Sequence, residues 1–399
     1  MELLGRPLVV LLGLLTVGLP AATYYVWFRV RGPRAARAAR AVAGVGLLAL
    51  SQVAAVALVA ALVNDYGYFY GSWNELFGAS TADAHPVRST PSGGGPVGRA
   101  GQPLESRGAG GVVTPRPGTG PASTARWAVS GRLESVTIRG GRSGLSEHAF
   151  VYLPPQYFQP AYARWTFPAV EVMTGYPGDD RSLVTRMDYP GVLQRQVAAG
   201  KAQPMVLVML RPTVVPPRDT ECTDVPSGPQ VETFLAQDVP VAMRSSIRVR
   251  PVGWGVVGDS TGGYCAAKIA MMHSDVFSAG VSISGYYHTL KDSTTGDLWG
   301  GSQVLRLLND PEWRLQHLPA PPVSLLLAAS RQELGTEGYS DTQRFLSLVK
   351  PPLVADSVLA NRGGHNYAAW AAQLPTAIGW LSAHLGAPVP TGATTRPGH

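Results

Sequence analysis

A single serine separates an apolar run from a run of helix-forming residues at 253–270, GWGVVGDSTGGYCAAKIA. The residues before Ser260 favour a buried strand, and the alanine-rich residues after it favour a helix. Gly258 and Gly262 flank the serine, which indicates a turn where the strand and helix backbones come very close. The chain must therefore fold around a strand, a sharp turn and a helix, with Ser260 at the turn.

Two interpretations of this turn are open from its residues alone. GDSTGG resembles the GDSGG nucleophile loop of trypsin-like proteases, and it also fits G-x-S-x-G, the nucleophile elbow of the α/β-hydrolases. A trypsin-like barrel needs its histidine and aspartate before the serine, and no suitable histidine loop precedes Ser260. Strand-like runs alternate with helical runs here, which is typical of a mostly parallel sheet covered by helices. We therefore predict an α/β-hydrolase fold.

The apolar runs place the individual strands of this sheet. GRLESVTIRG and HAFVYLPP favour an opening antiparallel pair of strands. Further buried strands are predicted at FPAVEVMTG, PMVLVML, GWGVVGD, AGVSISG and PPVSLLLAAS.

A histidine and a carboxylate should follow the serine, because an elbow triad runs in the order serine, acid, histidine. His365 lies in the loop NRGGHNYAAW, after the strand-like LVADSVLA and before the last helix. Glu333 follows the strand PPVSLLLAAS and is the favoured acid, while Asp341 has a structural alternative as the cap of the helix DTQRFLSLVK. The competing acids are Glu337, Asp341 and Asp356, and the histidines assigned elsewhere are His273, His288, His317 and His384.

These groups resemble the esterase-D branch of the α/β-hydrolases, whose best-known members are the secreted mycolyltransferases of the antigen 85 type. The resemblance covers roughly residues 132 to 385 and rests on QELG, on GH, and on an insertion containing LWG and DPEW. It implies a catalytic triad of Ser260, Glu333 and His365. It also suggests Trp299, in the insertion, as a residue of the substrate site.

The same resemblance implies an oxyanion hole made of two backbone N–H groups. These would come from Thr261 and, in the loop VMTGYPGDD, from Tyr176, although TGYPG also fits a plain β-turn. The chain departs from the mycolyltransferases at Thr174, at Pro177, and at HNY where the family commonly has HSW. These departures leave the triad untouched but put recognition of trehalose and mycolate in doubt.

Two uncharged apolar runs precede the strands, at residues 8–28 and 41–63. Each run is long enough to cross a bilayer as a helix. Five arginines lie in RVRGPRAARAAR between them, and such a basic loop favours the cytoplasmic side. A cleaved signal peptide is the alternative for the first run, but TYYVWF stands where small cleavage-site residues would be expected. We predict two transmembrane helices and an extracytoplasmic remainder.

Composition divides the chain into four parts. The stretch between the second span and the strands is rich in Gly, Pro and Ser and has too few large apolar groups to form a core. The parts are a membrane region at 1–78, a flexible linker at 79–125, a catalytic domain at 126–386 and a disordered tail at 387–399.

Charge and cysteine content limit the partners. The formal net charge is +7, and removing the five arginines of the basic loop leaves +2, so a nucleic-acid-binding face is not expected. No histidine or cysteine cluster has metal-ligand spacing, and no metal or cofactor is implied.

Cys222 and Cys265 are the only cysteines, and an exported location permits a disulfide between them. The alternative is two unpaired thiols, one of them buried.

Together these features predict a membrane-anchored, extracytoplasmic serine esterase or acyltransferase. Its substrate would be an acyl ester, with a cell-envelope lipid or glycolipid as the expected class. The alternatives are a non-catalytic binding protein of the cell envelope on the same fold, and a peptidase on that fold. The sequence leaves open the acyl chain and alcohol, hydrolysis against acyl transfer, and the oligomeric state.

Overall fold

The structure is a computed structural model that describes residues 6–28, 35–67, 111–113, 121–331, 333, 338–361 and 364–391. The chain divides into two compact units, residues 1–84 and 85–399. Each unit is considered by itself below.

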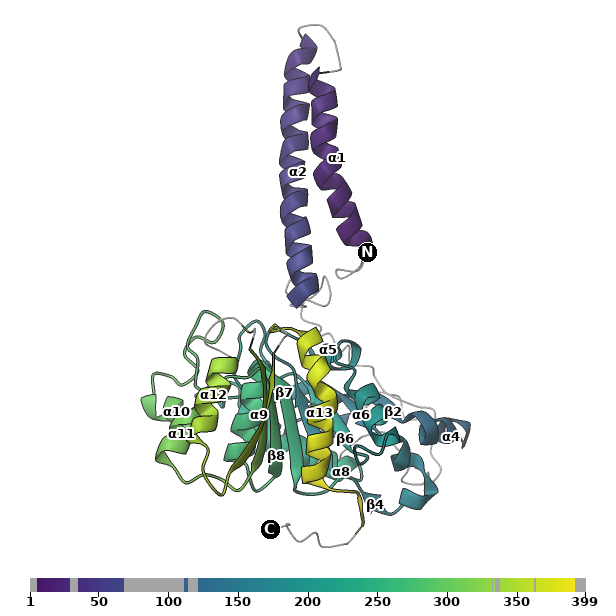
Figure 1. The fold of residues 1–399 in the computed structure, drawn as a ribbon, viewed down its shortest axis with the longest axis vertical. Coiled ribbons are helices and arrows are strands. Elements are labelled where there is room, and N and C mark those ends of the chain that lie inside the picture. Colours follow the sequence, from purple (N-terminus) through teal and green to yellow (C-terminus); the bar gives the residue numbers. More distant parts are fainter. Residues whose placement is uncertain are drawn as a thin grey trace. The chain divides into compact units, whose positions relative to one another are not determined.

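The first unit consists of two packed helices, α1 (Arg6–Phe28) and α2 (Ala35–Gly67), drawn in purple in Figure 1. Mean hydropathy reaches 1.8 within Pro7–Phe28 and 2.3 within Ala41–Asn64. Most of their apolar side chains point away from the partner helix, as Val17 does with 73% of its surface exposed. The two predicted apolar helices are therefore present, each long enough to cross a membrane.

In the second unit, one sheet contains nine of the described strands, in the order β1-β2-β3-β6-β5-β7-β8-β9-β10. The edge β1-β2-β3-β6 is antiparallel, and every pairing from β6 to β10 is parallel. The predicted opening pair and the mostly parallel sheet are confirmed. The strands are β1 (Gly111–Val113), β2 (Arg132–Arg139), β3 (Ser146–Leu153), β5 (Ala169–Met173), β6 (Val206–Leu210), β7 (Trp254–Asp259), β8 (Phe277–Ile283), β9 (Ser324–Ser330) and β10 (Val354–Ala360).

Helices cover both faces of the sheet, as Figure 1 shows for α13 in front of the strands. A side chain at Gly255 of β7 would strike Leu381 and Leu385 of α13, whereas one at Gly280 of β8 would strike Ala270 of α9. Gly280 pairs with Val256, the residue after Gly255. Since alternate strand residues face opposite sides, α13 and α9 lie on opposite faces. The main apolar core fills the α9 face, where Trp254, Phe277 and Ile269 are fully buried.

The described helices of this unit agree with the predicted alternation of strands and helices. The helix predicted from Asp341 begins two residues earlier, at Tyr339, so Asp341 lies in its first turn instead of at its cap. The helices are α4 (Pro121–Ser130), η1 (Pro155–Phe158), η2 (Pro160–Tyr162), α5 (Asp180–Thr185), α6 (Tyr189–Ala198), α7 (Val231–Thr233), η3 (Phe234–Asp238), α8 (Val239–Ser246), α9 (Thr261–Met272), α10 (Gln303–Leu308), α11 (Pro311–His317), α12 (Tyr339–Leu348) and α13 (Tyr367–Leu385).

Two strand pairings lie beyond the limits expected from composition. The short strand β1 lies inside the predicted linker 79–125 and pairs with β2, and α4 begins at Pro121. Inside the predicted tail 387–399, β11 (Val389–Pro390) pairs with β4 (Trp165–Thr166) in a separate two-stranded sheet. Glycine and proline lower strand propensity, but the unpaired edges of existing strands offer partners that composition does not show. The rest of the linker and residues 392–399 lie outside the described residues.

Candidate active site

Ser260 occupies the turn between β7 and α9, with φ 54° and ψ −122°. A non-glycine residue with positive φ is strained and persists only where its surroundings enforce it. A Cβ at Gly258 would lie 2.2 Å from the carbonyl oxygen of Gly262, and one at Gly262 would lie 2.5 Å from the carbonyl oxygen of Met173. Only glycine lets strand and helix come this close, and the result is a half-buried serine at the turn.

His365 is the histidine that contacts this serine. Its Nε2 lies 2.9 Å from Ser260 Oγ across 105 residues of sequence. The loop that carries it follows β10 and ends at Asn366, which caps α13 by accepting from the Ala369 N–H at 3.0 Å. The Trp370 ring packs edge-on against the imidazole with 5.0 Å between centroids. Desolvation of the His365 ring by its neighbours lowers its pKa, which favours the neutral form that can accept a proton.

Glu333 lies just beyond β9 with 8% of its surface exposed. Its Oε1 accepts from Ser284 Oγ at 2.5 Å and from the Ser330 N–H at 3.0 Å. Burial raises the pKa of this carboxyl, and these two hydrogen bonds oppose the shift. Its Oε2 has no hydrogen-bond partner, and no bond joins it to His365, among the residues that the structure describes. The role of Glu333 as the triad acid therefore stays a prediction.

Ser284 is a site residue that sequence reasoning missed. It follows β8 directly, is fully buried and has φ 51°. Its N–H donates to the Ala328 carbonyl at 2.6 Å, which fixes the residue against β9 next to Glu333. The serine in SISG is a weak signal, because nothing local distinguishes it from an ordinary strand-end serine. Its contact with Glu333 spans 49 residues and appears only when β8 and β9 pair.

The competing acids have other partners. Asp356 is exposed on β10 and accepts from Trp380 Nε1 at 2.7 Å. Asp341 is fully buried beside His288 and Arg344. Glu337 lies outside the described residues. Asp341 and Asp356 therefore bond to groups other than His365.

The histidines assigned elsewhere are likewise held by other groups. His273 Nε2 pairs with Glu232 at 3.0 Å, and His288 Nδ1 pairs with Asp341 at 3.3 Å. The Nδ1 atoms of His317 and His384 lie within 2.9 Å of the carbonyl oxygens of Trp313 and Trp380. The described contacts thus leave His365 as the partner of Ser260.

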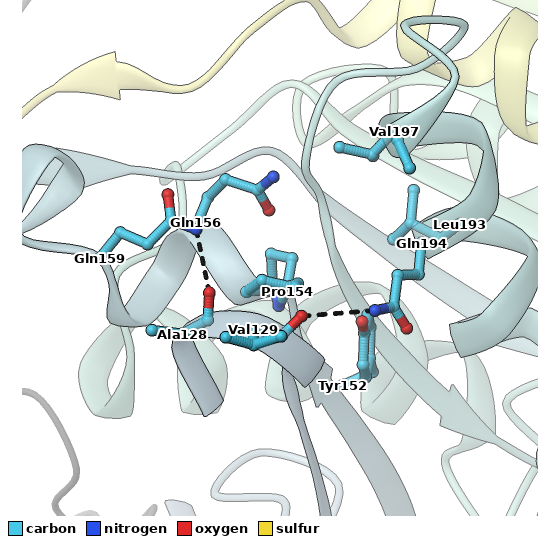
Figure 2. A pocket seen from close by; sticks show the side chains of 11 residues that line it. Ala128, Val129, Tyr152, Pro154, Gln156, Gln159, Leu193, Gln194 and Val197 are labelled. Carbon is cyan, nitrogen blue, oxygen red and sulfur yellow. Dashed lines mark hydrogen bonds between the residues drawn. The ribbon is translucent and has the colours of Figure 1, made fainter. Parts of the chain in front are cut away.

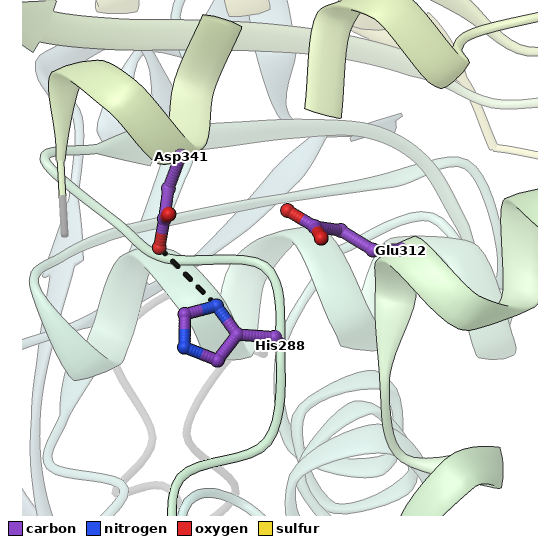
Figure 3. A group of neighbouring side chains, drawn as sticks. All are labelled: His288, Glu312 and Asp341. Atoms are coloured by element: carbon purple, nitrogen blue, oxygen red, sulfur yellow. Dashed lines mark ion pairs between the residues drawn. The ribbon is translucent and has the colours of Figure 1, made fainter. Parts of the chain in front are cut away.

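His288, Glu312 and Asp341 form a compact group whose candidate ligand atoms lie within 4.8 Å of one another (Figure 3). The Arg344 guanidinium donates to Glu312 at 2.8 Å and to Asp341 at 2.5 Å. Its positive charge offsets part of the negative charge of these two carboxylates. The group is therefore best described as an ion-pair cluster that joins α11 to α12.

The loop after β5 lies against the nucleophile. A Cβ at Gly175 would stand 2.7 Å from the Cβ of Ser260, and the Gly175 N–H donates to Asp259 Oδ2 at 2.9 Å. Gly178 N–H donates to the Gly175 carbonyl at 2.8 Å, so TGYPG is also a tight turn. Tyr176 follows Gly175, and its hydroxyl donates to the Pro217 carbonyl at 2.7 Å. The predicted oxyanion donor Tyr176 thus belongs to a loop in contact with Ser260.

The second predicted donor, Thr261, is the first residue of α9. A backbone N–H at a helix N-terminus has no partner within the helix and sits at its positive end. The Thr261 hydroxyl donates to Asp219 Oδ2 at 3.0 Å, which ties the start of α9 to a buried carboxyl. Burial raises the pKa of Asp219 to about 6. Sequence reasoning did not single out Asp219.

Trp299, predicted for the substrate site, has only 2% of its surface exposed. It packs with Val225 and Leu298 in a small cluster. Trp299 could therefore contact a substrate only after a rearrangement of the insertion, or affect binding through its neighbours. Its place in the substrate site stays a prediction.

The structure joins Cys222 to Cys265 in a disulfide with 5.8 Å between their Cα atoms. Both residues are fully buried, Cys265 in α9 and Cys222 in the loop after β6. Glu221 and Cys222 both have positive φ, so this loop holds an unfavourable backbone conformation. The disulfide fastens that loop to the elbow helix.

A fully buried lysine, Lys268, strengthens the same contact. Its Nζ donates to the Cys222 carbonyl and Thr223 Oγ1 at 3.0 Å and to Asn309 Oδ1 at 2.6 Å. Glu232 Oε2 supplies a counter-charge at 3.5 Å. From the sequence, Lys268 was predicted only to favour a helix, because its partners lie 36 to 47 residues away.

We expect no free thiol in the exported protein. Alkylation before reduction should add no mass, and alkylation after reduction should modify both Cys222 and Cys265. Replacing both by alanine should lower the free energy of unfolding by about 3–4 kcal/mol, given a separation of 43 residues. Two alkylated cysteines in exported, unreduced protein would contradict the pairing.

Comparison with known proteins finds a family match within the second unit. Residues 143–326 match the Esterase family. The second unit is therefore similar to this esterase family, over less than half of the chain. The matched segment contains the elbow serine and ends within β9, so Glu333 and His365 lie beyond it.

Two curated proteins are similar to parts of this chain. An uncharacterized protein of Corynebacterium glutamicum is 22% identical over 269 residues, which cover 63% of this chain and 62% of that protein. The MPT51/MPB51 antigen of Mycobacterium tuberculosis is 32% identical over 74 residues, or 18% of this chain and 25% of the antigen. The chain thus spans less than two thirds of either relative.

Among solved structures, an S-formylglutathione hydrolase from Agrobacterium tumefaciens superposes with a TM-score of 0.55 and 14% identity. The match covers 64% of this chain and 96% of that structure. At this identity the superposition establishes the fold, and the predicted α/β-hydrolase architecture is confirmed.

Proposed function

We propose that this protein is a serine esterase or acyltransferase anchored in the membrane, with its catalytic domain outside the cytoplasm. The observation that carries the proposal is the 2.9 Å contact between His365 Nε2 and Ser260 Oγ at a strained turn between strand and helix. A positioned base next to a serine on such a turn is the arrangement that activates a hydroxyl for attack.

In the proposed reaction, Ser260 Oγ attacks the ester carbonyl carbon and its proton passes to His365 Nε2. The backbone N–H groups of Thr261 and Tyr176 stabilise the negative oxygen of the tetrahedral intermediate. The intermediate collapses to an acyl-enzyme, and His365 returns the proton to the departing alcohol. Water or a second alcohol then attacks the acyl group, with His365 again accepting the proton, and Ser260 is restored.

Glu333 is the proposed partner of His365 Nδ1. One of its carboxylate oxygens is held by Ser284 and Ser330, while Oε2 has no partner among the described residues. A carboxylate fixed through one oxygen can use the other to hold an imidazole in the required tautomer. This assignment also follows the order of serine, acid and histidine along the chain.

The proposed substrate is the acyl ester of a cell-envelope lipid or glycolipid. The two apolar helices would keep the domain near the membrane surface, where such esters are concentrated. The departures at Thr174 and Pro177 argue against transferring the trehalose and mycolate specificity of the mycolyltransferases to this chain.

Release of nitrophenol from short-chain nitrophenyl esters tests the activity. We expect the purified chain in detergent to cleave these esters and to leave peptide nitroanilides intact. Ser260→Ala, purified in parallel, is the control for contaminating esterases. Cleavage of peptides alone would indicate the peptidase, and no cleavage of either would favour the non-catalytic binding protein.

The proposed topology predicts which parts of the chain a protease reaches in intact cells. Protease added outside should remove the domain beyond residue 80, while the arginine-rich loop between α1 and α2 stays protected. The reason is that basic loops are retained on the cytoplasmic side. Recovery of a soluble cytoplasmic domain would contradict both the anchor and the orientation.

A further inference from the structure

A second serine, histidine and aspartate are joined by hydrogen bonds on the β2–β3 pair. His148 Nε2 lies 2.7 Å from Ser135 Oγ, and His148 Nδ1 lies 2.5 Å from Asp180 Oδ2. One imidazole thus connects a hydroxyl to a carboxylate through its two nitrogens. This is the connectivity of a catalytic triad, which is recognised by geometry and not by sequence position.

The strand register explains why these residues meet. β2 and β3 are antiparallel, with Ser135 opposite Phe150 and Thr137 opposite His148. Because side chains alternate across a sheet, Ser135 and His148 share one face and lie on a diagonal. Asp180, the first residue of α5, reaches the same face because α5 packs against β3.

Exposure differs along this chain of hydrogen bonds. Ser135 is exposed, the His148 side chain is 45% exposed, and the Asp180 side chain is only 12% exposed. The Phe150 ring packs edge-on against the imidazole with 4.8 Å between centroids. The hydroxyl and the base are therefore open to a reagent, while the acid and an aromatic ring hold the base in place.

We propose that Ser135, His148 and Asp180 form a second nucleophilic site, which accepts the acyl group of an apolar, activated ester onto Ser135. Ser135 Oγ forms a bond to the carbonyl carbon as its proton moves to His148 Nε2. The bond from that carbon to the ester oxygen breaks, and the departing alcohol takes the proton from His148. Asp180 accepts a hydrogen bond from Nδ1 and stabilises the transient imidazolium.

An apolar pocket on the same face gives the acyl chain a place to bind. Tyr152 lies two residues beyond Phe150 on β3, on the same face, which puts it about 7 Å further along the strand from the residue opposite Ser135. Tyr152 lines a cavity of about 230 Å³ together with Val129, Leu193 and Val197 (Figure 2). A chain bound to Ser135 can therefore run past Phe150 and into this pocket.

The Ser135 site differs from the Ser260 site in the backbone that follows the serine, and this difference decides how the Ser135 site is tested. Ser135 lies within a strand, whereas the N–H groups at the start of α9 follow Ser260. With a base but without that oxyanion stabilisation, the second site should react with activated reagents and turn over slowly. Covalent labelling is therefore the appropriate measurement.

The test uses the full-length chain in detergent with Ser260→Ala, so that the elbow serine cannot react. A long-chain alkyl fluorophosphonate should form a Ser135 Oγ–phosphorus bond, with fluoride leaving and the proton passing to His148. Trypsin releases the site as peptide 133–139, LESVTIR, in which fragmentation separates Ser135 from Thr137. An unlabelled peptide at a reagent excess that labels Ser260 in the parent chain would overturn the proposal.

Variants distinguish a triad from an ordinary exposed hydroxyl. His148→Ala should slow labelling of Ser135 by about 100-fold or more, because the general base is lost. Asp180→Asn should slow it less, and Thr137→Ala, on the same face, is the control that should leave the rate unchanged. A rate that His148→Ala does not alter would overturn the proposal, and because His148 is exposed this variant should fold normally.

Chain-length dependence tests the pocket separately. Long-chain reagents should label Ser135 faster than short-chain reagents, and Val197→Trp should reduce the long-chain rate to the short-chain rate. Equal rates for both reagents in the Ser260→Ala chain would exclude the pocket as the acyl site. Because Ser260 is absent throughout, these outcomes do not depend on the function proposed for the elbow.

Discussion

Ser260→Ala and His365→Ala are each expected to lower kcat/KM for nitrophenyl esters by about 10⁴-fold or more. The expectation follows from the direct contact between the two side chains, at 2.9 Å. Without the base the hydroxyl is a weak nucleophile, and without the hydroxyl the base has no proton to accept. Steady-state kinetics on the purified variants, with thermal melting to show that they are folded, provides the measurement.

The double variant tests whether Ser260 and His365 act as one unit. Ser260→Ala combined with His365→Ala should be hardly less active than either single variant, because residues that act as one unit are not additive. The residual rate would come from substrate binding and the oxyanion donors. Full activity in Ser260→Ala would show that the turn is not the nucleophile elbow.

The acid is tested by a matched pair of variants. Glu333→Gln should lower kcat by about 10³-fold, since an orienting acid contributes somewhat less than nucleophile or base. Asp356→Asn is the control, because Asp356 is exposed and bonded to Trp380. Normal activity in Glu333→Gln with loss in Asp356→Asn or Asp341→Asn would reassign the acid while leaving Ser260 and His365 in place.

The second large effect concerns stability. Lys268→Met should lower the free energy of unfolding by about 3–5 kcal/mol, because it removes one partner of a buried ion pair and hydrogen-bond network. Glu232, Asn309 and the Cys222 carbonyl would each lose a donor that is itself fully buried. For a domain of this size the loss corresponds to a fall in Tm of about 10 °C.

Lys291→Met is the control for Lys268→Met. Lys291 is exposed, so the same substitution there should change Tm very little. Differential scanning calorimetry of both variants under non-reducing conditions separates the lysine network from the disulfide. Equal Tm values would show that Lys268 does not stabilise the attachment of the loop to α9.

The parts of the site that sequence patterns predicted are those with a local cause. The turn at Ser260 follows from glycines at positions 258 and 262, where a Cβ would meet backbone atoms. His365 follows from its place between a strand and the last helix. Each of these signals lies within about ten residues of the group that it predicts.

The parts that were missed depend on contacts between distant segments. Ser284 holds Glu333 only because β8 and β9 pair side by side. Lys268 is buried only because the loop after β6 folds over α9. The pairing of β1 with β2 escaped notice for a similar reason, since a glycine-rich stretch is ordered there by a neighbouring strand edge. No window of sequence contains both partners of such contacts.

The close approach around Ser260 also limits how this site can be engineered. A methyl group at Gly175, Gly258 or Gly262 would strike the serine or a backbone atom within 2.7 Å. Directed evolution toward a new substrate should therefore leave these three glycines unchanged. Libraries that keep them should retain folded, active clones at a much higher frequency than libraries that vary them.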